Sequence, residues 1–181
     1  MDPGWAAMMG ALVGAIATSS AGVLTWWSLR WQQGVQVQAE RERWLREKQR
    51  ATYSDFLDAT QGAVDGLESV GRGFSAATPD VTDLYECLGD EVIPHVISAR
   101  RKLASVQIDG PASAEVAARK LHRSVNTCMM AAMRGLHALA NDEENARLPV
   151  GLRDTFDETL RGVHSNLRDF TQVARTVIQG P

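Results

Sequence analysis

The sequence has few of the residues that build metal centres, disulfide frameworks or nucleic-acid surfaces. Its 181 residues include two cysteines, Cys87 and Cys128, and no CxxC pair, which argues against a structural zinc site. The formal net charge of −3 is too close to neutral for a nucleic-acid-binding protein. The phosphate-binding patterns GxxxxGKS/T and GxGxxG are both absent, so no nucleotide site is recognisable. We expect both cysteines to be reduced and buried, because free cysteine behaves as a small apolar residue.

Charged residues are missing from one long segment, which extends from Pro3 to Leu29. Its length exceeds the roughly 18 apolar residues at which a segment becomes a candidate for crossing a membrane. Tryptophans stand near both of its ends: Trp5, Trp26, Trp27 and Trp31. Tryptophan prefers the membrane interface because its ring is apolar while its N–H needs a polar partner. We therefore expect a single transmembrane anchor over residues 1–29.

Basic residues are concentrated on one side of this segment. Those that follow it are Arg30, Arg41, Arg43, Arg46, Lys48 and Arg50. The positive-inside rule places this side in the cytoplasm. We expect a cell-membrane protein whose amino terminus lies outside and whose carboxy-terminal domain is cytoplasmic. A cleaved signal peptide is the alternative, although no basic segment precedes the apolar residues.

Small residues recur at every fourth position of the expected anchor, and we call them the small-residue stripe: Ala6, Gly10, Gly14, Thr18 and Gly22. Two of them, Gly10 and Gly14, form a GxxxG pair, which allows two helix backbones to approach closely. We expect the small-residue stripe to associate with another copy of the chain. The alternative is that it reflects the ordinary composition of membrane helices.

Residues 30–50 are polar and helix-forming, and they predict a charged juxtamembrane helix. From residue 51 the pattern changes, and apolar residues recur at spacings of three and four, which is typical of coiled coils and helical bundles. Three breakers interrupt this pattern, at residues 78–80, at residues 109–111 and at Pro149. No stretch alternates with the period of a strand. The sequence thus predicts an all-α chain, with an up-and-down four-helix bundle over residues 51–181.

Each predicted helix carries one apolar stripe that should face the core. In the first it is Tyr53, Phe56, Thr60, Ala63, Leu67, Val70 and Phe74. In the second it is Leu84, Cys87, Leu88, Val92, Val96, Leu103 and Val106, and Pro94 should kink or break this helix near Asp90. In the third it is Val116, Leu121, Val125, Cys128, Ala132, Leu136 and Leu139. In the fourth it is Leu152, Phe156, Leu160, Val163, Leu167, Phe170, Ala174 and Val177.

Glycines weaken the end of the first predicted helix: Gly62, Gly66, Gly71 and Gly73. Each costs roughly 0.5–1 kcal/mol relative to alanine in a helix interior. They indicate either close packing against another helix or fraying of the helix near residue 71.

No residues form a recognisable catalytic, cofactor or metal site. Glu91 and His95 share a helix face, but the ExxH pairs of di-iron bundles are missing, so a surface ion pair is the better interpretation. We expect all four histidines at the surface or at the bundle edge. Met129, Met130 and Met133 lie beside Cys128 and fit core packing or a partner-binding groove. The basic run Arg100-Arg101-Lys102 fits a solvated helix end, with contact to membrane or nucleic acid as the alternative.

Two segments resemble a group of uncharacterised actinobacterial membrane-anchored helical proteins. The first is RERWLREKQRATYSDFLDAT, in which a tryptophan and charged residues precede a Y-x-x-F-L helix, and the second is ARRKLASVQIDGP. The resemblance implies a membrane helix followed by a helical domain. The group has no established activity, so the resemblance implies no site residues.

These observations favour a membrane-tethered interaction or scaffold module that self-associates, without catalysis and without a cofactor. Its expected partners are membrane lipid, another copy of the chain and a cytoplasmic protein, and not nucleic acid. Two alternatives stay open. One is a membrane effector or pore that uses the bundle as a sensor, since Thr18, Ser19, Ser20 and Thr25 could line a polar path. The other is an enzyme or small-ligand receptor, which would need ionisable residues inside the apolar stripes.

Overall fold

The computed structural model describes residues 3–76, 78–141 and 148–179, and for residues 3–37 and Ala39 it describes the backbone alone. Nearly all of these residues are helical and none of them lies in a strand, so the all-α prediction is confirmed. Contacts divide the chain into two units, Met1–Leu45 and Arg46–Pro181. The boundary falls within the segment predicted as the juxtamembrane helix. The second unit holds the helical bundle and is described below.

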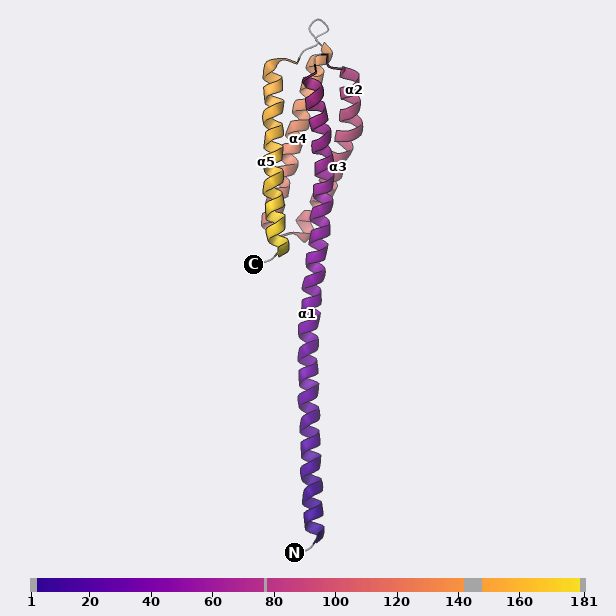
Figure 1. Cartoon of the computed structure of the whole chain (residues 1–181), viewed down its shortest axis with the longest axis vertical. Coiled ribbons are helices and arrows are strands. Elements are labelled where there is room, and N and C mark those ends of the chain that lie inside the picture. Colours follow the sequence, from indigo (N-terminus) through magenta and orange to yellow (C-terminus); the bar gives the residue numbers. More distant parts are fainter. Residues whose placement is uncertain (1–2, 77, 142–147, 180–181) are drawn as a thin grey trace. The chain divides into compact units, whose positions relative to one another are not determined.

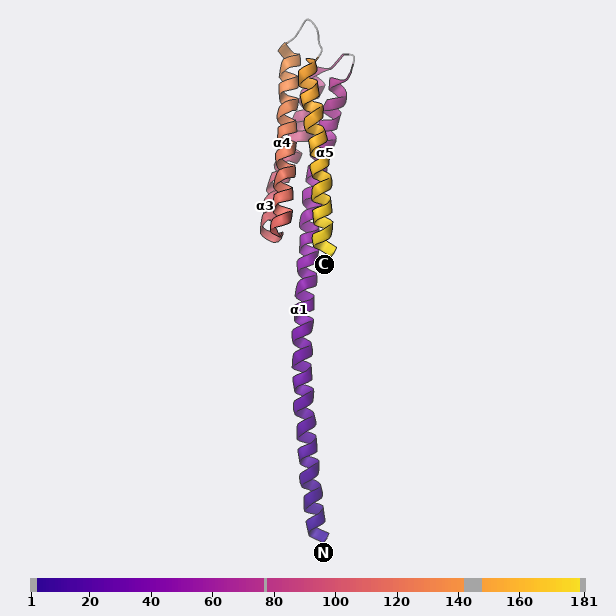
Figure 2. The same ribbon diagram turned by 90° about the vertical axis from the view of Figure 1, so that its left-hand side faces the viewer.

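The helices follow one another with short connections (Figure 1). They are α1 (Pro3–Phe74), α2 (Val81–Glu86), the π-helix η1 (Cys87–Val92), α3 (Ile93–Asp109), α4 (Ala112–Asn141) and α5 (Val150–Gln179). Because α2, η1 and α3 continue into one another, they act as one bent helix. The bundle is built from this bent helix, from α4, from α5 and from the part of α1 that belongs to the second unit (Figure 2).

The helix boundaries fall at the predicted breakers. Asp80 caps α2, since its Oδ1 accepts hydrogen bonds from the backbone N–H groups of Thr82 at 2.9 Å and Asp83 at 3.3 Å. Gly110 ends α3 in an extended conformation, with φ −100° and ψ 158°. The carbonyl of Pro149 accepts the first backbone hydrogen bonds of α5. A proline is tolerated at such a start because the N–H that it lacks would have no partner within the helix.

Pro94 explains why the second helix is bent. Its ring collides with the carbonyl four residues earlier in a regular α-helix, and it cannot donate the hydrogen bond expected there. That carbonyl belongs to Asp90, which lies in the π-helical turn Cys87–Val92. The wider π turn accommodates the proline, so the predicted interruption of the α-helix near Asp90 is confirmed.

The apolar stripes meet in one continuous core. Every residue of the first predicted stripe, from Tyr53 to Phe74, is buried, including Thr60. The prediction for Val116 is wrong, because this side chain is 66% exposed. Ala114 and Ala118 are buried in its place, two positions to either side of Val116. These small side chains continue the spacing of Leu121 and the residues after it.

Aromatic rings lock α5 against α1. Phe170 of α5 meets Phe56 edge-to-face, with ring centroids 5.1 Å apart, and meets Tyr53 at 6.0 Å. A second pair, Phe74 and Phe156, packs in the same way at 5.3 Å. Such edge-to-face pairs add to the stabilisation that burial of the rings provides.

The glycines of α1 mark close helix approach, and the helix continues past residue 71 to Phe74. A Cβ atom placed on Gly66 would lie 2.7 Å from Cγ2 of Val92 in η1. One on Gly62 would lie 2.5 Å from the ring of His95, and one on Gly73 would overlap Leu84. Of the two interpretations of these glycines, close packing is therefore the correct one.

Candidate functional site

The interior of the bundle is apolar. Two of the buried residues that the structure describes carry a hydroxyl group, Tyr53 and Thr60, and Oγ1 of Thr60 donates a hydrogen bond to the carbonyl of Phe56 at 2.8 Å. The stripes of the described helices bring no buried carboxylate or cation into the core. An enzyme or ligand site in the bundle core would need such groups, so candidate sites must be sought at the surface.

No group of histidine, cysteine and acidic residues in the described part of the chain is placed to hold a metal ion. The predicted surface ion pair between Glu91 and His95 is not found among the described residues, and the His95 ring lies over Gly62 of α1. His164 lies 3.3 Å from a carboxylate oxygen of Glu68, at the surface. His122 is half-buried, and burial together with nearby Arg100 lowers the pKa of its ring, which favours the neutral imidazole at pH 7.

A polar surface hollow of about 450 Å³ lies where α1 meets η1 and α3. Its lining residues are Gly62, Asp65, Gly66, Glu68, Ser69, Arg72, Glu91 and His95. The hollow exists because the two glycines bring the helices together while longer polar side chains stand around them. π-Helical turns often accompany functional sites, and η1 forms one wall. The charged side chains of the lining are exposed or half-buried and of mixed sign, so the hollow lacks the buried polar group that would orient a ligand.

The two cysteines differ in environment. Cys128 is buried, and burial raises the pKa of its thiol to about 11. Cys87 is half-buried, and its Sγ donates weak hydrogen bonds to Oε2 of Glu91 at 3.5 Å and to the carbonyl of Gly66 at 3.8 Å. Burial and the Glu91 carboxylate raise its pKa as well. Both thiols therefore stay protonated at neutral pH, and neither is an activated nucleophile. The prediction of burial is confirmed for Cys128 and holds only in part for Cys87.

We expect a thiol reagent at pH 8 to modify native Cys128 at least about 100-fold more slowly than an unfolded cysteine, because the thiolate fraction falls tenfold for each unit of pKa. Cys87 should react first, and mass spectrometry of the labelled peptides separates the two sites. Unfolding returns the pKa of the Cys128 thiol to its ordinary value of 9.0, so the contribution of the buried thiol to stability is present below pH 9 and is lost as the pH rises toward 11. Equal labelling of the two native thiols would contradict the burial of Cys128.

A polar joint ties the turn between α3 and α4 to α1. The carboxylate of Asp109 accepts a hydrogen bond from Nζ of Lys48 at 2.7 Å and one from Oγ1 of Thr52 at 3.3 Å. Nε2 of Gln49 donates to the carbonyl of Asp109 at 2.8 Å. We call these four residues the Asp109 joint. It fixes the last residue of α3 to the first turns of α1 within the bundle. Charge-assisted hydrogen bonds of this kind are stronger than neutral ones.

Tyr53 lies next to the Asp109 joint. Its hydroxyl is buried and has no hydrogen-bond partner among the described residues. Burial, and then the charge of Asp109, raises its pKa. A Cβ atom on Gly110 would lie 2.9 Å from this hydroxyl and 2.7 Å from the carbonyl of Val106, so glycine is required at the turn for steric reasons. The Tyr53 side chain thus packs against the turn between α3 and α4.

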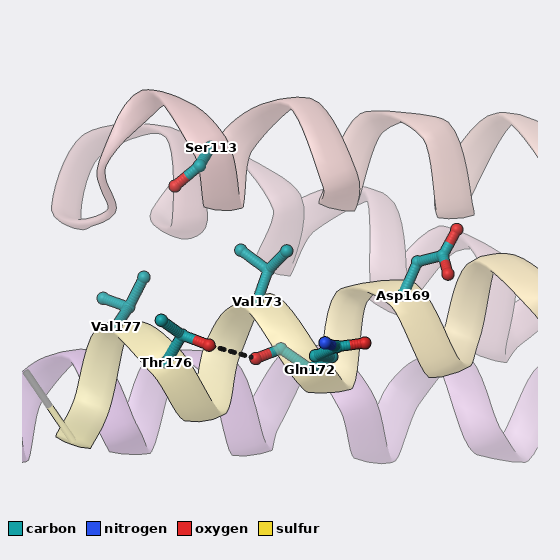
Figure 3. Close-up of a pocket in the computed structure, with 6 residues that line it drawn as sticks. All are labelled: Ser113, Asp169, Gln172, Val173, Thr176 and Val177. Carbon is teal, nitrogen blue, oxygen red and sulfur yellow. Dashed lines mark hydrogen bonds between the residues drawn. The ribbon is translucent and has the colours of Figure 1, made fainter.

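A shallow groove of about 390 Å³ lies between the start of α4 and the end of α5 (Figure 3). Val173 and Val177 point from α5 toward Ser113 of α4. The groove carries one hydrogen bond between lining residues, from Oγ1 of Thr176 to the carbonyl of Gln172 at 3.0 Å. Its lining is mainly apolar and holds one carboxylate, that of Asp169. The groove therefore has the character of a contact surface and not of a reaction site.

The methionines beside Cys128 form no core layer of their own. Met130 and Met133 are exposed and Met129 is half-buried, so α4 presents flexible apolar side chains to solvent. Arg100 and Arg101 are exposed on α3, whereas Lys102 pairs with Asp55 of α1 at 2.7 Å. The basic run is thus a solvated helix face with one member used to hold α1.

The residues predicted to meet the membrane lie outside the described side chains. They are the small-residue stripe Ala6, Gly10, Gly14, Thr18 and Gly22, and the interface residues Trp5, Trp26, Trp27, Arg30 and Trp31. Within the part of the chain that the structure describes, no helix has the length and apolar character needed to cross a bilayer. The anchor over residues 1–29 and the residues assigned to it therefore stay predictions.

Comparison of the chain with known protein families, with curated proteins and with solved structures finds no match. The resemblance noted from sequence segments accordingly stays a prediction. The candidate site rests on the geometry of this chain alone, and within the described residues that geometry is concentrated at the helix surfaces.

Proposed function

We propose that this protein is a membrane-tethered helical interaction module that self-associates and does not catalyse a reaction. Residues 1–29 supply the anchor, residues 30–50 form a charged spacer, and the bundle carries the surfaces that partners contact. The uncharged segment from Pro3 to Leu29, with tryptophans at its ends and basic residues after it, supports the anchor and the cytoplasmic placement of the bundle.

One observation carries the proposal, and it is the apolar interior of the bundle. The described core holds two buried hydroxyl-bearing residues: Thr60, whose hydroxyl is satisfied by its own helix, and Tyr53. A protein with such an interior offers partners its surface. Exposed apolar side chains of α4, such as Met130 and Met133, are the type of residue found in adaptable binding surfaces.

The two alternatives make different demands. A pore would require the polar residues Thr18, Ser19, Ser20 and Thr25 to line a water-filled path between associated anchors. A small-ligand receptor would use the polar hollow beside η1, which is the feature of the described residues that favours it. Dye leakage from vesicles that hold the chain tests the first alternative. If substitution of Glu91 and Arg72 leaves the biological function of the protein intact, the small-ligand receptor is excluded.

Crosslinking in native membranes tests self-association. We expect the wild-type chain to give a discrete dimer or higher oligomer, and we expect Gly10→Leu/Gly14→Leu to reduce that product at least about tenfold, because bulky side chains prevent close backbone approach. The matched control is Ala11→Leu/Ala15→Leu, which adds the same side chains at the same spacing on a neighbouring face.

Two results would contradict the proposal. If the Gly10/Gly14 variant and its control crosslink equally, the small-residue stripe is not an association surface. If the wild-type chain gives no oligomer at any expression level, the self-associating part of the function is wrong. Partner binding would then have to be explained by the monomeric bundle.

A further inference from the structure

The charges of the bundle are separated along its length. We call one half the base, which comprises residues 46–60, 95–126 and 165–179, and the other half the far end, which comprises the described residues among 61–94 and 127–164. The base contains eleven basic and six acidic residues, a net charge of +5. The far end contains four basic and ten acidic residues, a net charge of −6. The net charge of −3 for the whole chain conceals this asymmetry.

Ion pairs within the base use most of its acidic residues. Asp109 pairs with Lys48 at 2.7 Å, Asp55 with Lys102 at 2.7 Å, Asp169 with Lys120 at 3.7 Å, and Glu115 with Arg119. Within the described residues, the exposed arginines Arg101 and Arg123 take part in no ion pair. Their charges extend into solvent, where they are available to an anionic partner.

Large apolar side chains are exposed in the same half. Ile108 is 81% exposed at the end of α3, Val116 is 66% exposed at the start of α4, and Ile97 is 47% exposed on α3. Basic side chains beside exposed aliphatic ones are typical of surfaces that lie in the headgroup region of a bilayer. Arginine is especially suited to this position, because its guanidinium group binds phosphate oxygens with two hydrogen bonds.

The base is the end of the bundle that is nearest to the predicted anchor along the chain. Lys48 and Gln49 belong to the Asp109 joint, so the base is the end at which the chain enters the bundle from the predicted anchor. Figures 1 and 2 show the α3–α4 turn and the end of α5 at this same end of the bundle. In a tethered protein, the base is thus the end connected to the membrane by the shortest length of chain.

We propose that the base of the bundle binds an anionic bilayer surface, through its exposed arginines and the aliphatic side chains around the α3–α4 turn. The occupant is the lipid phosphate layer of a membrane rich in anionic headgroups. The inference rests on the proposed tether for the proximity of base and membrane, and it assigns a partner to one end of the bundle. The acidic far end is repelled by the same surface, which orients the bundle.

The test uses the full chain in lipid nanodiscs, either of phosphatidylcholine alone or with one third phosphatidylglycerol. We expect backbone hydrogen exchange in the α3–α4 turn to be at least about threefold slower in the anionic discs, because lipid contact restricts opening and solvent access there. Added salt should reverse the effect. Arg101→Glu/Arg123→Glu should abolish it. The matched control Arg134→Glu/Arg161→Glu makes the same change of charge at the far end and should retain it.

Equal exchange in the two kinds of disc would overturn the inference. The inference would also be overturned if exchange slowed equally in both kinds of disc and slowed further with more chains per disc. The base would then contact the acidic far end of a second copy. If carbonate extraction shows that the chain is not tethered, the inference is tested by pelleting the free chain with anionic vesicles. Binding that falls about 30-fold in Arg101→Glu/Arg123→Glu supports the inference, and no binding overturns it.

Discussion

Phe170→Ala is expected to lower the free energy of unfolding by about 3–5 kcal/mol, the usual cost of removing a buried phenylalanine. The ring is fully buried and meets Phe56 and Tyr53 edge-to-face, at 5.1 Å and 6.0 Å between centroids. Its removal leaves a cavity between α5 and α1 that rigid helix backbones cannot close. The loss of both ring pairs adds to the loss of burial.

Chemical denaturation of the full chain, followed by circular dichroism, measures this change. The control is Val150→Ala, because Val150 is 74% exposed at the start of α5 and should change stability by no more than about 0.5 kcal/mol. If Phe170→Ala were as stable as the control, the packing of α5 on α1 described here would be wrong.

Gly66→Ala is expected to destabilise the fold by about 1–3 kcal/mol, although alanine is the better helix former by roughly 1 kcal/mol. The new methyl group would lie 2.7 Å from Cγ2 of Val92, and 3.5 Å from the backbone nitrogen of the same residue. α1 would have to move away from η1 to admit it. Gly162→Ala is the matched control, since no atom lies within 4 Å of the new methyl group in α5.

The two glycine variants should change stability in opposite directions. Gly162→Ala should stabilise the fold by about 0.5–1 kcal/mol through the lower backbone entropy of the unfolded chain. Val92→Ala in the Gly66→Ala background should recover part of the loss, because it removes the atom that collides. Stabilisation by Gly66→Ala would show that α1 and η1 do not approach closely.

Local features of the sequence were sufficient to predict most helix boundaries. Proline and glycine act on their own backbone, so Gly110 and Pro149 mark a helix end and a helix start wherever the rest of the chain lies. Pro94 likewise predicts a bend, because its clash is with a carbonyl of the same helix. The structure accommodates Pro94 with the π turn of η1. This form depends on how the second helix packs against α1, which no local sequence pattern encodes.

Contacts between distant segments could not be predicted. Lys48, Gln49 and Thr52 bond Asp109 across 57 to 61 residues of chain, and nothing near Asp109 indicates such partners. Large apolar residues are usually buried, which predicts Val116 inward, yet the small Ala114 and Ala118 occupy the buried positions. The glycines of α1 were ambiguous for the same reason, since their role depends on Val92, His95 and Leu84.

The candidate surfaces became visible only when sequence and structure were combined. Counting charges along the chain gives a nearly neutral protein, whereas the antiparallel helices bring basic residues from α3, α4 and α5 to one end. The exposed fraction of its side chain then distinguishes Ile108 from the apolar residues that are buried in the core. The small-residue stripe and the tryptophan positions remain sequence predictions.

The central claim is that residues 1–29 tether the bundle to a membrane, and alkaline carbonate extraction tests it most directly. The wild-type chain should remain in the membrane pellet. Val13→Arg/Ile16→Arg should be released into the supernatant, because each charge in the middle of a span costs about 2.5–3.5 kcal/mol. The control Val35→Arg/Val37→Arg places the same charges in the spacer and should stay in the pellet. Release of the wild-type chain by carbonate would contradict the account.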